Sequence, residues 1–283
     1  MLDSLQQSAP LAVTAAAVLG LLVGSFLNVV IHRVPRMLER EWAQQAAEVR
    51  GEHAPAEERY DLIVPRSHCP SCGHRIGALE NIPLLSWLRQ RGKCTACGAS
   101  IPARYPIVEL ATGALSAIAV WRFGATAEGL GAVVLTCFLI ALAFIDLDTQ
   151  LLPDSMTLPL LWLGLLFNLS GAFAPLPAAV IGAMAGYLSL WSIYWLFKLA
   201  TGKEGMGYGD FKLLAALGAW FGWTALPAVI LLASVVGAAV GIVLIVAARH
   251  GREVPIPFGP YLAGAGLLAL YFRGPLANLF GVG

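Results

Sequence analysis

Charged side chains are scarce in this sequence: they make up 12% of its 283 residues, while 58% are hydrophobic. A soluble globular domain carries about 25% charged residues, and the mean hydropathy of this chain is +0.73. The shortage excludes an ordinary soluble domain and indicates a membrane protein. We expect a lipid bilayer around the chain and predict no nucleic-acid partner.

Basic residues are also missing ahead of the first apolar run. Residues 1–10 contain Asp3 but no Lys or Arg, whereas a secretory signal peptide begins with a basic segment. Arg33 and Arg36 follow the apolar run 11–31 instead. The run is therefore predicted to be a retained helix whose N-terminus faces away from the cytoplasm.

The apolar runs set the number of predicted spans, since a spanning helix needs about 20 residues. The runs lie at 11–31, 107–121, 130–145, 155–174, 178–197, 213–248 and 258–272. As one helix, 213–248 would reach about 54 Å, against about 30 Å for the hydrocarbon core. We therefore expect a break near 222–227, and an all-α polytopic protein with about eight transmembrane helices.

The charges are concentrated in one segment. Between His32 and Pro106 lie 11 of the 18 Lys and Arg residues. With this segment in the cytoplasm, alternating spans place 16 basic residues inside and only Arg122 and Arg273 outside, as the positive-inside rule favours. The predicted organisation is a first transmembrane helix (1–31), a cytoplasmic cysteine domain (32–106) and a seven-helix membrane core (107–283).

Four cysteines form two short repeats within that domain. Each repeat is Cys-x2-Cys-Gly, and the four residues are Cys69, Cys72, Cys94 and Cys97. The spacing between the pairs is one residue longer than the usual four-cysteine zinc range. Four thiolates leave no open position on a tetrahedral Zn²⁺, which predicts a structural site rather than a catalytic one.

The cysteines allow other interpretations. Two disulfides are one alternative, disfavoured because thiols stay reduced in the cytoplasm. His68 and His74 adjoin the repeats and could replace a ligand, although we expect surface positions for both. Cys137, alone in an apolar run, is interpreted as a packing residue.

Two aspartates, Asp146 and Asp210, stand at the ends of apolar runs. Ionisable groups at membrane depth are costly, so they indicate a functional site. The predicted topology puts both on the cytoplasmic side, on different connections. Two carboxylates that meet share a proton, so that one can act as base on water and the other as acid, as in aspartic proteases.

Each aspartate has a structural alternative or a rival. Asp210 follows Gly-x-Gly, a weak signal by itself, and could simply cap a helix N-terminus. Asp148 and Asp154 lie close to Asp146; we expect Asp154 to be an N-cap. Asp146 lies nearest the apolar run and is therefore the preferred candidate.

The chain resembles the prepilin leader peptidase/N-methyltransferases of type IV pilus and type II secretion systems. The resemblance covers nearly the whole length and is specific because several segments occur together in order. These are Gly24–Pro35 (GSFLNVVIHRVP), the cysteine tetrad, Asn81–Trp87 (NIPLLSW), Arg104–Glu109 (RYPIVE), Ile145–Asp154 (IDLDTQLLPD) and Gly207–Asp210 (GYGD).

The resemblance implies a bifunctional enzyme of the bacterial inner membrane. Its catalytic aspartates map onto Asp146 and Asp210, and the four cysteines match its zinc tetrad. Such enzymes cleave the short basic leader of prepilins and pseudopilins after a glycine, at the cytoplasmic face. They then methylate the new N-terminal amine, usually of phenylalanine, with S-adenosylmethionine. Some members lack the cysteine domain, which implies that zinc is not required for cleavage.

The sequence gives much weaker indications of the methyl-donor site. No glycine-rich strand–turn–helix fingerprint is present, so a soluble Rossmann-type site is not expected. Gly24, Asn28 and Arg33, with Glu109 opposite, are candidate contributors. Gly24 could equally serve helix packing, and Arg33 could anchor the helix at the interface.

Two other functions remain as alternatives. A non-enzymatic transporter or assembly factor would use the acids as a proton relay and the zinc domain for docking. A zinc hydrolase is disfavoured, because four thiolates leave no ligand position for water.

Overall fold

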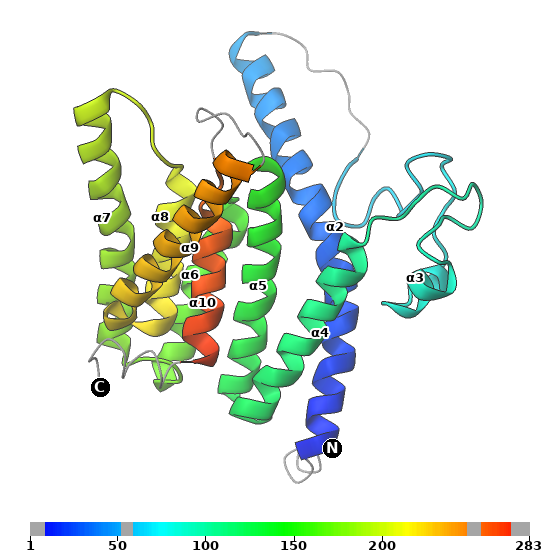
Figure 1. Cartoon of the computed structure of the whole chain (residues 1–283), viewed down its shortest axis with the longest axis horizontal. Helices are drawn as coiled ribbons and strands as arrows, with labels where there is room; N and C mark the ends of the chain where they lie inside the picture. The colour runs from blue at the N-terminus through cyan, green and yellow to red at the C-terminus, as the bar shows by residue number, and fades with distance from the viewer. Residues whose placement is uncertain (1–8, 52–58, 248–255, 273–283) are drawn as a thin grey trace. The chain divides into compact units, whose positions relative to one another are not determined.

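The computed structural model of the chain describes residues 9–51, 59–247 and 256–272. It divides into two compact units, Met1–Ala125 and Thr126–Gly283, and each is described by itself. Helices make up all the regular elements in these described ranges (Figure 1), apart from two isolated bridges in the cysteine segment. The all-α prediction is confirmed. Asp3 and Arg273 lie outside the described residues.

The first unit is built on one pair of long helices. Helix α2 (Ala9–Val49) packs against α4 (Arg104–Phe123). Two short helices, η1 (Ala78–Glu80) and α3 (Leu85–Arg89), come between them in the sequence. The predicted span 11–31 thus continues without interruption into the polar segment that follows. At about 1.5 Å per residue α2 reaches roughly 60 Å, twice the thickness of a hydrocarbon core.

Glycines allow α2 and α4 to approach closely. A Cβ added to Gly24 would lie 2.7 Å from the Cα of Glu109, and one added to Gly20 would lie 2.9 Å from the Cα of Gly113. Contact positions rise along α2 as they fall along α4, so the two helices are antiparallel. Small residues at such an interface are typical of helix pairs in membranes.

The second unit is a helical bundle. Its elements are α5 (Ala127–Thr149), α6 (Asp154–Phe167), η2 (Asn168–Ser170), α7 (Leu176–Thr201), α8 (Tyr208–Phe221), η3 (Trp223–Ala225), α9 (Leu226–Ala247) and α10 (Gly259–Tyr271). The predicted break in the run 213–248 is confirmed, because α8 ends at Gly222 with φ +79°. Glycine adopts that conformation without strain.

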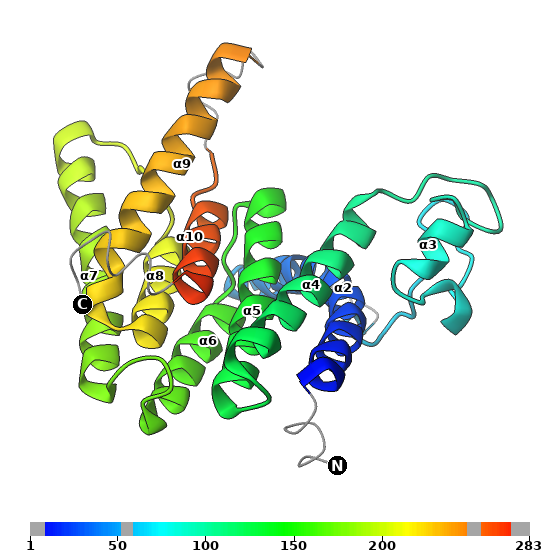
Figure 2. The same ribbon diagram turned by 60° about the horizontal axis from the view of Figure 1, so that its bottom comes forward.

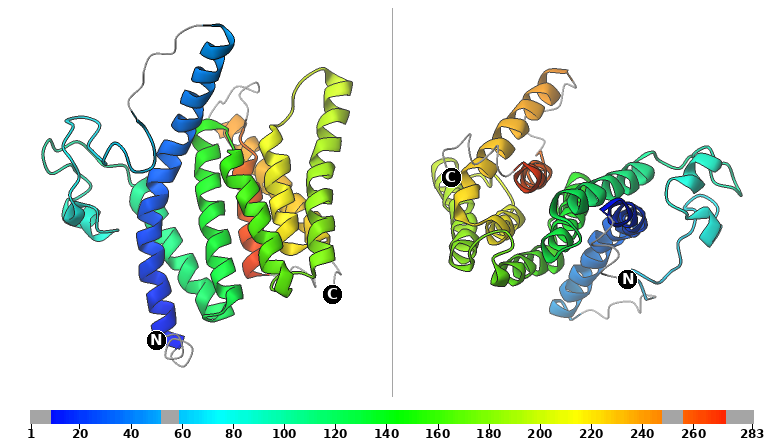
Figure 3. Two further views of the ribbon diagram at one scale, coloured as in Figure 1. Left: turned by 180° about the vertical axis from the view of Figure 1, so that it is seen from behind. Right: turned by 90° about the horizontal axis from the view of Figure 1, so that it is seen from below.

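Helix α8 forms the core of this bundle. It packs against α6, α7 and α10, and of its residues from Asp210 to Phe221 all but Lys212 are buried. Helices α7 and α6 lie on either side of it (Figure 3), while α9 crosses the bundle obliquely and its last turns project beyond it (Figure 2). The first turn of α8 therefore combines an exposed Tyr208 with a buried Asp210.

Fewer helices than predicted are long enough to cross a membrane. Among the described residues five meet the requirement by length and composition, namely α2, α4, α5, α7 and α9. Helices α6, α8 and α10 have only 14, 14 and 13 residues, or about 20 Å each. The predicted count of about eight transmembrane helices is therefore too high by this measure: each apolar run forms a helix, but three of the described helices are too short, and a turn ends α6 before its run ends.

The turn that ends α6 has a clear physical cause. Asn168 ends α6, and its amide donates to the carbonyls of Ala219 and Trp220, at 2.8 and 3.0 Å. Its Oδ1 accepts from the N–H groups of Phe173 and Ala174. The apolar run 155–174 is consequently folded into a helix and a turn rather than one span.

Candidate active site and metal centre

Asp146 lies in the last turn of α5 and is only 4% exposed. Its Oδ2 accepts a hydrogen bond from the backbone N–H of Gly259, at 2.9 Å. Gly259 is the first residue of α10, so its N–H has no partner within the helix. The N-terminus of a helix carries partial positive charge and stabilises a carboxylate.

Asp210 lies in the first turn of α8 and is 6% exposed. The N-cap of α8 is Gly207, and Asp210 follows it by three residues. Its Oδ1 is buried and meets no hydrogen-bond donor among the described residues. Buried polar atoms are nearly always bonded, and exceptions of this kind call for an explanation such as a catalytic role.

The structure brings the two aspartates into one region. A Cβ built on Gly209, next to Asp210, would lie 2.6 Å from Cβ of Leu152 and 3.4 Å from its Cδ1. A Cβ built on Gly259 would lie 3.2 Å from the same Cδ1 and 2.6 Å from Asp146 Oδ2. The first residues of α8 and α10 thus both contact Leu152, which places the two aspartates near one another.

The rival acids have different surroundings. Asp148 and Asp154 are both exposed, and Asp154 forms an ion pair with Lys212 at 2.6 Å. The N-cap of α6 is Pro153 rather than Asp154, which corrects the predicted cap by one residue. This ion pair joins the first turn of α6 to α8.

The four cysteines of the tetrad converge. Their Sγ atoms all lie within 4.8 Å of one another; Cys69 and Cys97 are 3.9 Å apart, and Cys72 and Cys94 4.0 Å. Tetrahedral coordination with Zn–S bonds of about 2.3 Å requires sulfurs about 3.8 Å apart. The donor set and its spacing therefore fit a tetrahedral metal ion.

The two repeats fold alike. Gly73 and Gly98 have φ of +72° and +73°, and their N–H groups donate to Cys69 and Cys94 carbonyls at 2.9 Å each. Each glycine turns the chain beneath the sulfurs, as the sequence repeat predicts. All five cysteines are free, which disfavours the disulfide alternative, and Cys137 is partly buried in α5.

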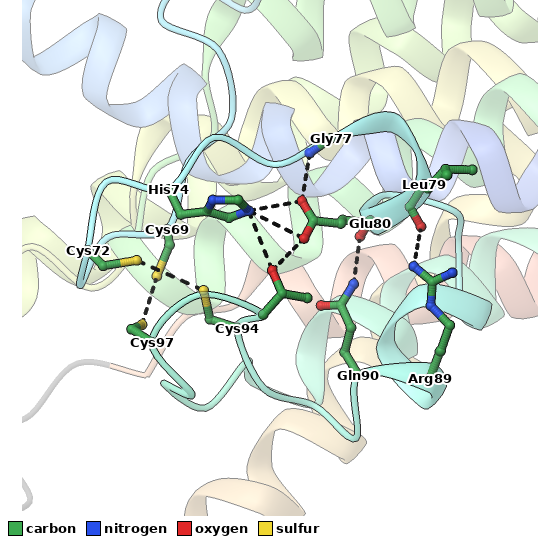
Figure 4. A network of polar contacts seen from close by, with 11 residues as sticks. Cys69, Cys72, His74, Gly77, Leu79, Glu80, Arg89, Gln90, Cys94 and Cys97 are labelled. Atoms are coloured by element: carbon green, nitrogen blue, oxygen red, sulfur yellow. Dashed lines mark hydrogen bonds and ion pairs between the residues drawn. The ribbon is translucent and has the colours of Figure 1, made fainter.

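Glu80 links the two repeats (Figure 4). Its carboxylate accepts hydrogen bonds from Gly77 N–H at 2.9 Å and from the Thr95 hydroxyl at 2.5 Å, and lies 3.1 Å from His74 Nε2. These three contacts lower the pKa of Glu80 to about 2, and the Gly77 hydrogen bond contributes most. His74 is thus directed to Glu80, whereas His68 is exposed and contacts the Arg66 carbonyl.

The methyl-donor candidates are all buried in the first unit. The amide of Asn28 donates to the carbonyl of Tyr105 at 3.1 Å. Arg33 donates to the carbonyls of Asp61 and Pro65, at 2.8 and 2.6 Å.

The space beside Gly24 is filled by the Glu109 backbone. The Glu109 carboxylate in turn accepts from Leu84 N–H at 2.8 Å. These contacts make the four residues a packing and anchoring set. Their part in a methyl-donor site remains a prediction from the sequence.

The sequence did not single out Gly259 or Glu80. The signal for Gly259 was the Gly-Pro pair opening the apolar run 258–272, typical of a helix start with a free N–H. Its partner lies 113 residues away along the chain. No local pattern shows such a contact.

Comparisons with known proteins agree with this arrangement. Residues 18–123 match the bacterial peptidase A24 N-terminal domain, and residues 133–242 match the type IV leader peptidase family. A prepilin leader peptidase/N-methyltransferase of Aeromonas salmonicida is 62% identical over 253 residues, covering 88% of this chain and 87% of the relative.

Two further relatives carry the same name. That of Stutzerimonas stutzeri is 60% identical over 265 residues, with 93% and 92% covered. That of Pseudomonas aeruginosa is 56% identical over 275 residues, with 96% and 95% covered. No solved structure matches the chain significantly. Since both family domains match in order and the relatives align almost end to end, the chain belongs to the type IV leader peptidase family.

Proposed function

We propose that this protein cleaves the leader peptide from type IV prepilins and type II secretion pseudopilins, and then methylates the new N-terminal residue. The names of relatives up to 63% identical support both activities. The observation that carries the peptidase assignment is the pair of buried carboxylates, Asp146 and Asp210, in one region of the helical bundle.

Cleavage proceeds by acid–base chemistry on water. The ionised aspartate takes a proton from water as the water oxygen attacks the scissile carbonyl carbon, and the protonated aspartate gives its proton to the carbonyl oxygen. The tetrahedral intermediate then loses the amine, which takes the proton from the first aspartate. The second regains its proton from a hydroxyl of the intermediate, and both acids return to their starting states.

Two cofactors belong to the proposal. Zn²⁺ held by Cys69, Cys72, Cys94 and Cys97 supplies a structural crosslink, since four thiolates fill its coordination sphere. S-adenosylmethionine supplies the methyl group. Gly24, Asn28 and Arg33, at the cytoplasmic end of the first predicted span, and Glu109 opposite them stay candidates for that site.

The proposed location is the bacterial inner membrane, with the aspartates and the cysteine domain facing the cytoplasm. The concentration of basic residues between His32 and Pro106 supports this orientation. The division into a first helix (1–31), a cytoplasmic domain (32–106) and a seven-helix core (107–283) is part of the same proposal.

The test uses purified protein in detergent with a synthetic prepilin peptide and S-adenosylmethionine, analysed by mass spectrometry. We expect a product shortened by the leader and carrying one added methyl group. Asp146→Asn and Asp210→Asn should abolish cleavage, whereas the control Asp148→Asn, at an exposed position, should retain it. Full cleavage by either dyad variant would overturn the assignment, and no cleavage by the unaltered protein would favour a transporter or assembly factor.

A further inference from the structure

Among the described residues, one hydrogen bond holds the Asp146 carboxylate. Its Oδ2 accepts the Gly259 N–H at 2.9 Å. That donor is the first backbone N–H of α10, a 13-residue helix. Because a carboxylate has two oxygens, one fixed bond sets the rotation of the group and leaves Oδ1 for a reacting molecule.

The Asp146 carboxylate occupies the space that a side chain at position 259 would need. A Cβ added at Gly259 would lie 2.6 Å from Asp146 Oδ2 and 3.1 Å from its Cγ. Real Cβ atoms do not approach an oxygen so closely, so any larger residue displaces the carboxylate. The absence of a side chain at this position is therefore a requirement of the Asp146 geometry.

The partner carboxyl has one oxygen without such a bond. Asp210 Oδ1 is buried without a donor among the described residues, while the start of its helix contacts Leu152, which also contacts the start of α10. Asp146 is thus oriented by a backbone donor far along the chain, whereas one oxygen of Asp210 is buried without a donor in the described parts of the chain. The two members of the dyad are inequivalent.

We propose that Gly259 is a positioning residue for peptide cleavage: its N–H orients Asp146 as the ionised member of the dyad, and its missing side chain leaves room for that carboxylate. The inference rests on the proposed peptidase function. Asp210 is then the protonated member, which donates to the scissile carbonyl oxygen. A backbone donor at a helix N-terminus favours the charged form of the acid that it contacts.

The test compares two glycines of the same helix. Gly259→Ala displaces the carboxylate, whereas Gly264→Ala adds a Cβ with no atom within 4 Å. We expect kcat for cleavage to fall about 10- to 100-fold in Gly259→Ala, with KM for the peptide unchanged, since a charge-assisted hydrogen bond is lost. Gly264→Ala should match the unaltered protein in both constants.

Folding is checked by methylation of a peptide that already carries a free N-terminal phenylalanine. Gly259→Ala should retain this activity, because the atom that must move is the end of a side chain. An unchanged kcat in Gly259→Ala would overturn the inference while leaving the peptidase assignment intact. If the unaltered protein cleaved no prepilin, the proposed function itself would fail.

A second measurement needs no variant at Gly259. Hydrogen exchange of the Gly259 amide should become about tenfold faster or more in Asp146→Ala, because its acceptor is gone. Exchange at an unchanged rate would contradict the inference even if Gly259→Ala failed to fold.

Discussion

The Asp210 carboxyl has the least favourable surroundings of any described side chain with an assigned role. It is 6% exposed and its Oδ1 has no donor in the described parts of the chain. Burial of an unbonded polar atom costs about 1–3 kcal/mol. The protein retains this group at the expense of stability, as is common at active sites.

A prediction follows for the stability of Asp210→Asn. The amide has nearly the same shape and is never charged, so its burial costs no more than that of the acid. We expect the variant to unfold in detergent at a Tm equal to or above that of the unaltered protein, with cleavage lost. A clear drop in Tm would show that Asp210 has a structural role that these contacts do not account for.

In the first unit, the single residue Glu80 connects the two cysteine repeats. It joins one repeat through His74 and the other through Thr95. We expect Glu80→Gln to weaken zinc binding by about tenfold, as loss of such outer contacts does in other metal sites. Competition with a chelator measures this, and Glu39→Gln, at an exposed position of α2, should leave zinc affinity unchanged.

The contribution of Glu80 to the stability of the fold depends on pH in a defined direction. The pKa of Glu80 is lowered from 4.5 to about 2 by the Gly77 N–H first and by Thr95 and His74 next. A lowered acid pKa stabilises the fold above the unfolded value, and the benefit is lost as pH falls through the folded value. The difference in free energy of unfolding between Glu80→Gln and the unaltered protein should stay constant from neutral pH to about 5. It should then shrink toward zero near pH 2. A difference that grows on acidification would contradict this account.

At the scale of elements, α7 and α8 make the closest backbone contact of the second unit. A Cβ on Gly218 would meet the Gly182 carbonyl, and one on Gly182 would meet the Gly218 carbonyl. Neither obstacle is a flexible side chain, so the helices themselves would have to separate. The position of α8, and with it Asp210, depends on this contact.

We therefore expect Gly218→Ala to destabilise the protein by about 1–3 kcal/mol, the usual cost of overpacking. Cleavage should fall as well, because α8 carries Asp210 in its first turn. Thermal unfolding and peptide cleavage measure the two effects, with Gly264→Ala as the unobstructed control. Normal stability in Gly218→Ala would mean that the bundle can relax around the added methyl group.

Sequence patterns predicted the elements better than their ends. Each apolar run became a helix, and the break at Gly222 was foreseen from length alone. The early end of α6 was not, because it depends on bonds from Asn168 to Ala219 and Trp220, far along the chain. The same holds for the site: burial costs identified Asp146, whereas its donor Gly259 is visible only in the fold.

At the scale of the whole molecule, the two chemical centres lie in different compact units. The cysteine tetrad belongs to Met1–Ala125, and both aspartates belong to Thr126–Gly283. In the described parts of the chain, the contacts around the two aspartates come from their own unit, through Gly207, Leu152 and Gly259. Metal binding and dyad geometry therefore have separate structural supports.

Removal of the metal should consequently spare peptide cleavage. We expect Cys97→Ser to lose bound zinc while kcat/KM for cleavage stays within about twofold, as for independent sites. Metal analysis and the peptide assay measure the two properties on the same sample. Cys137→Ala is the matched control, since this cysteine lies in α5 outside the tetrad and its loss should leave zinc content unchanged. Cleavage that disappears together with the zinc would show that the second unit needs an intact cysteine domain to assemble its dyad.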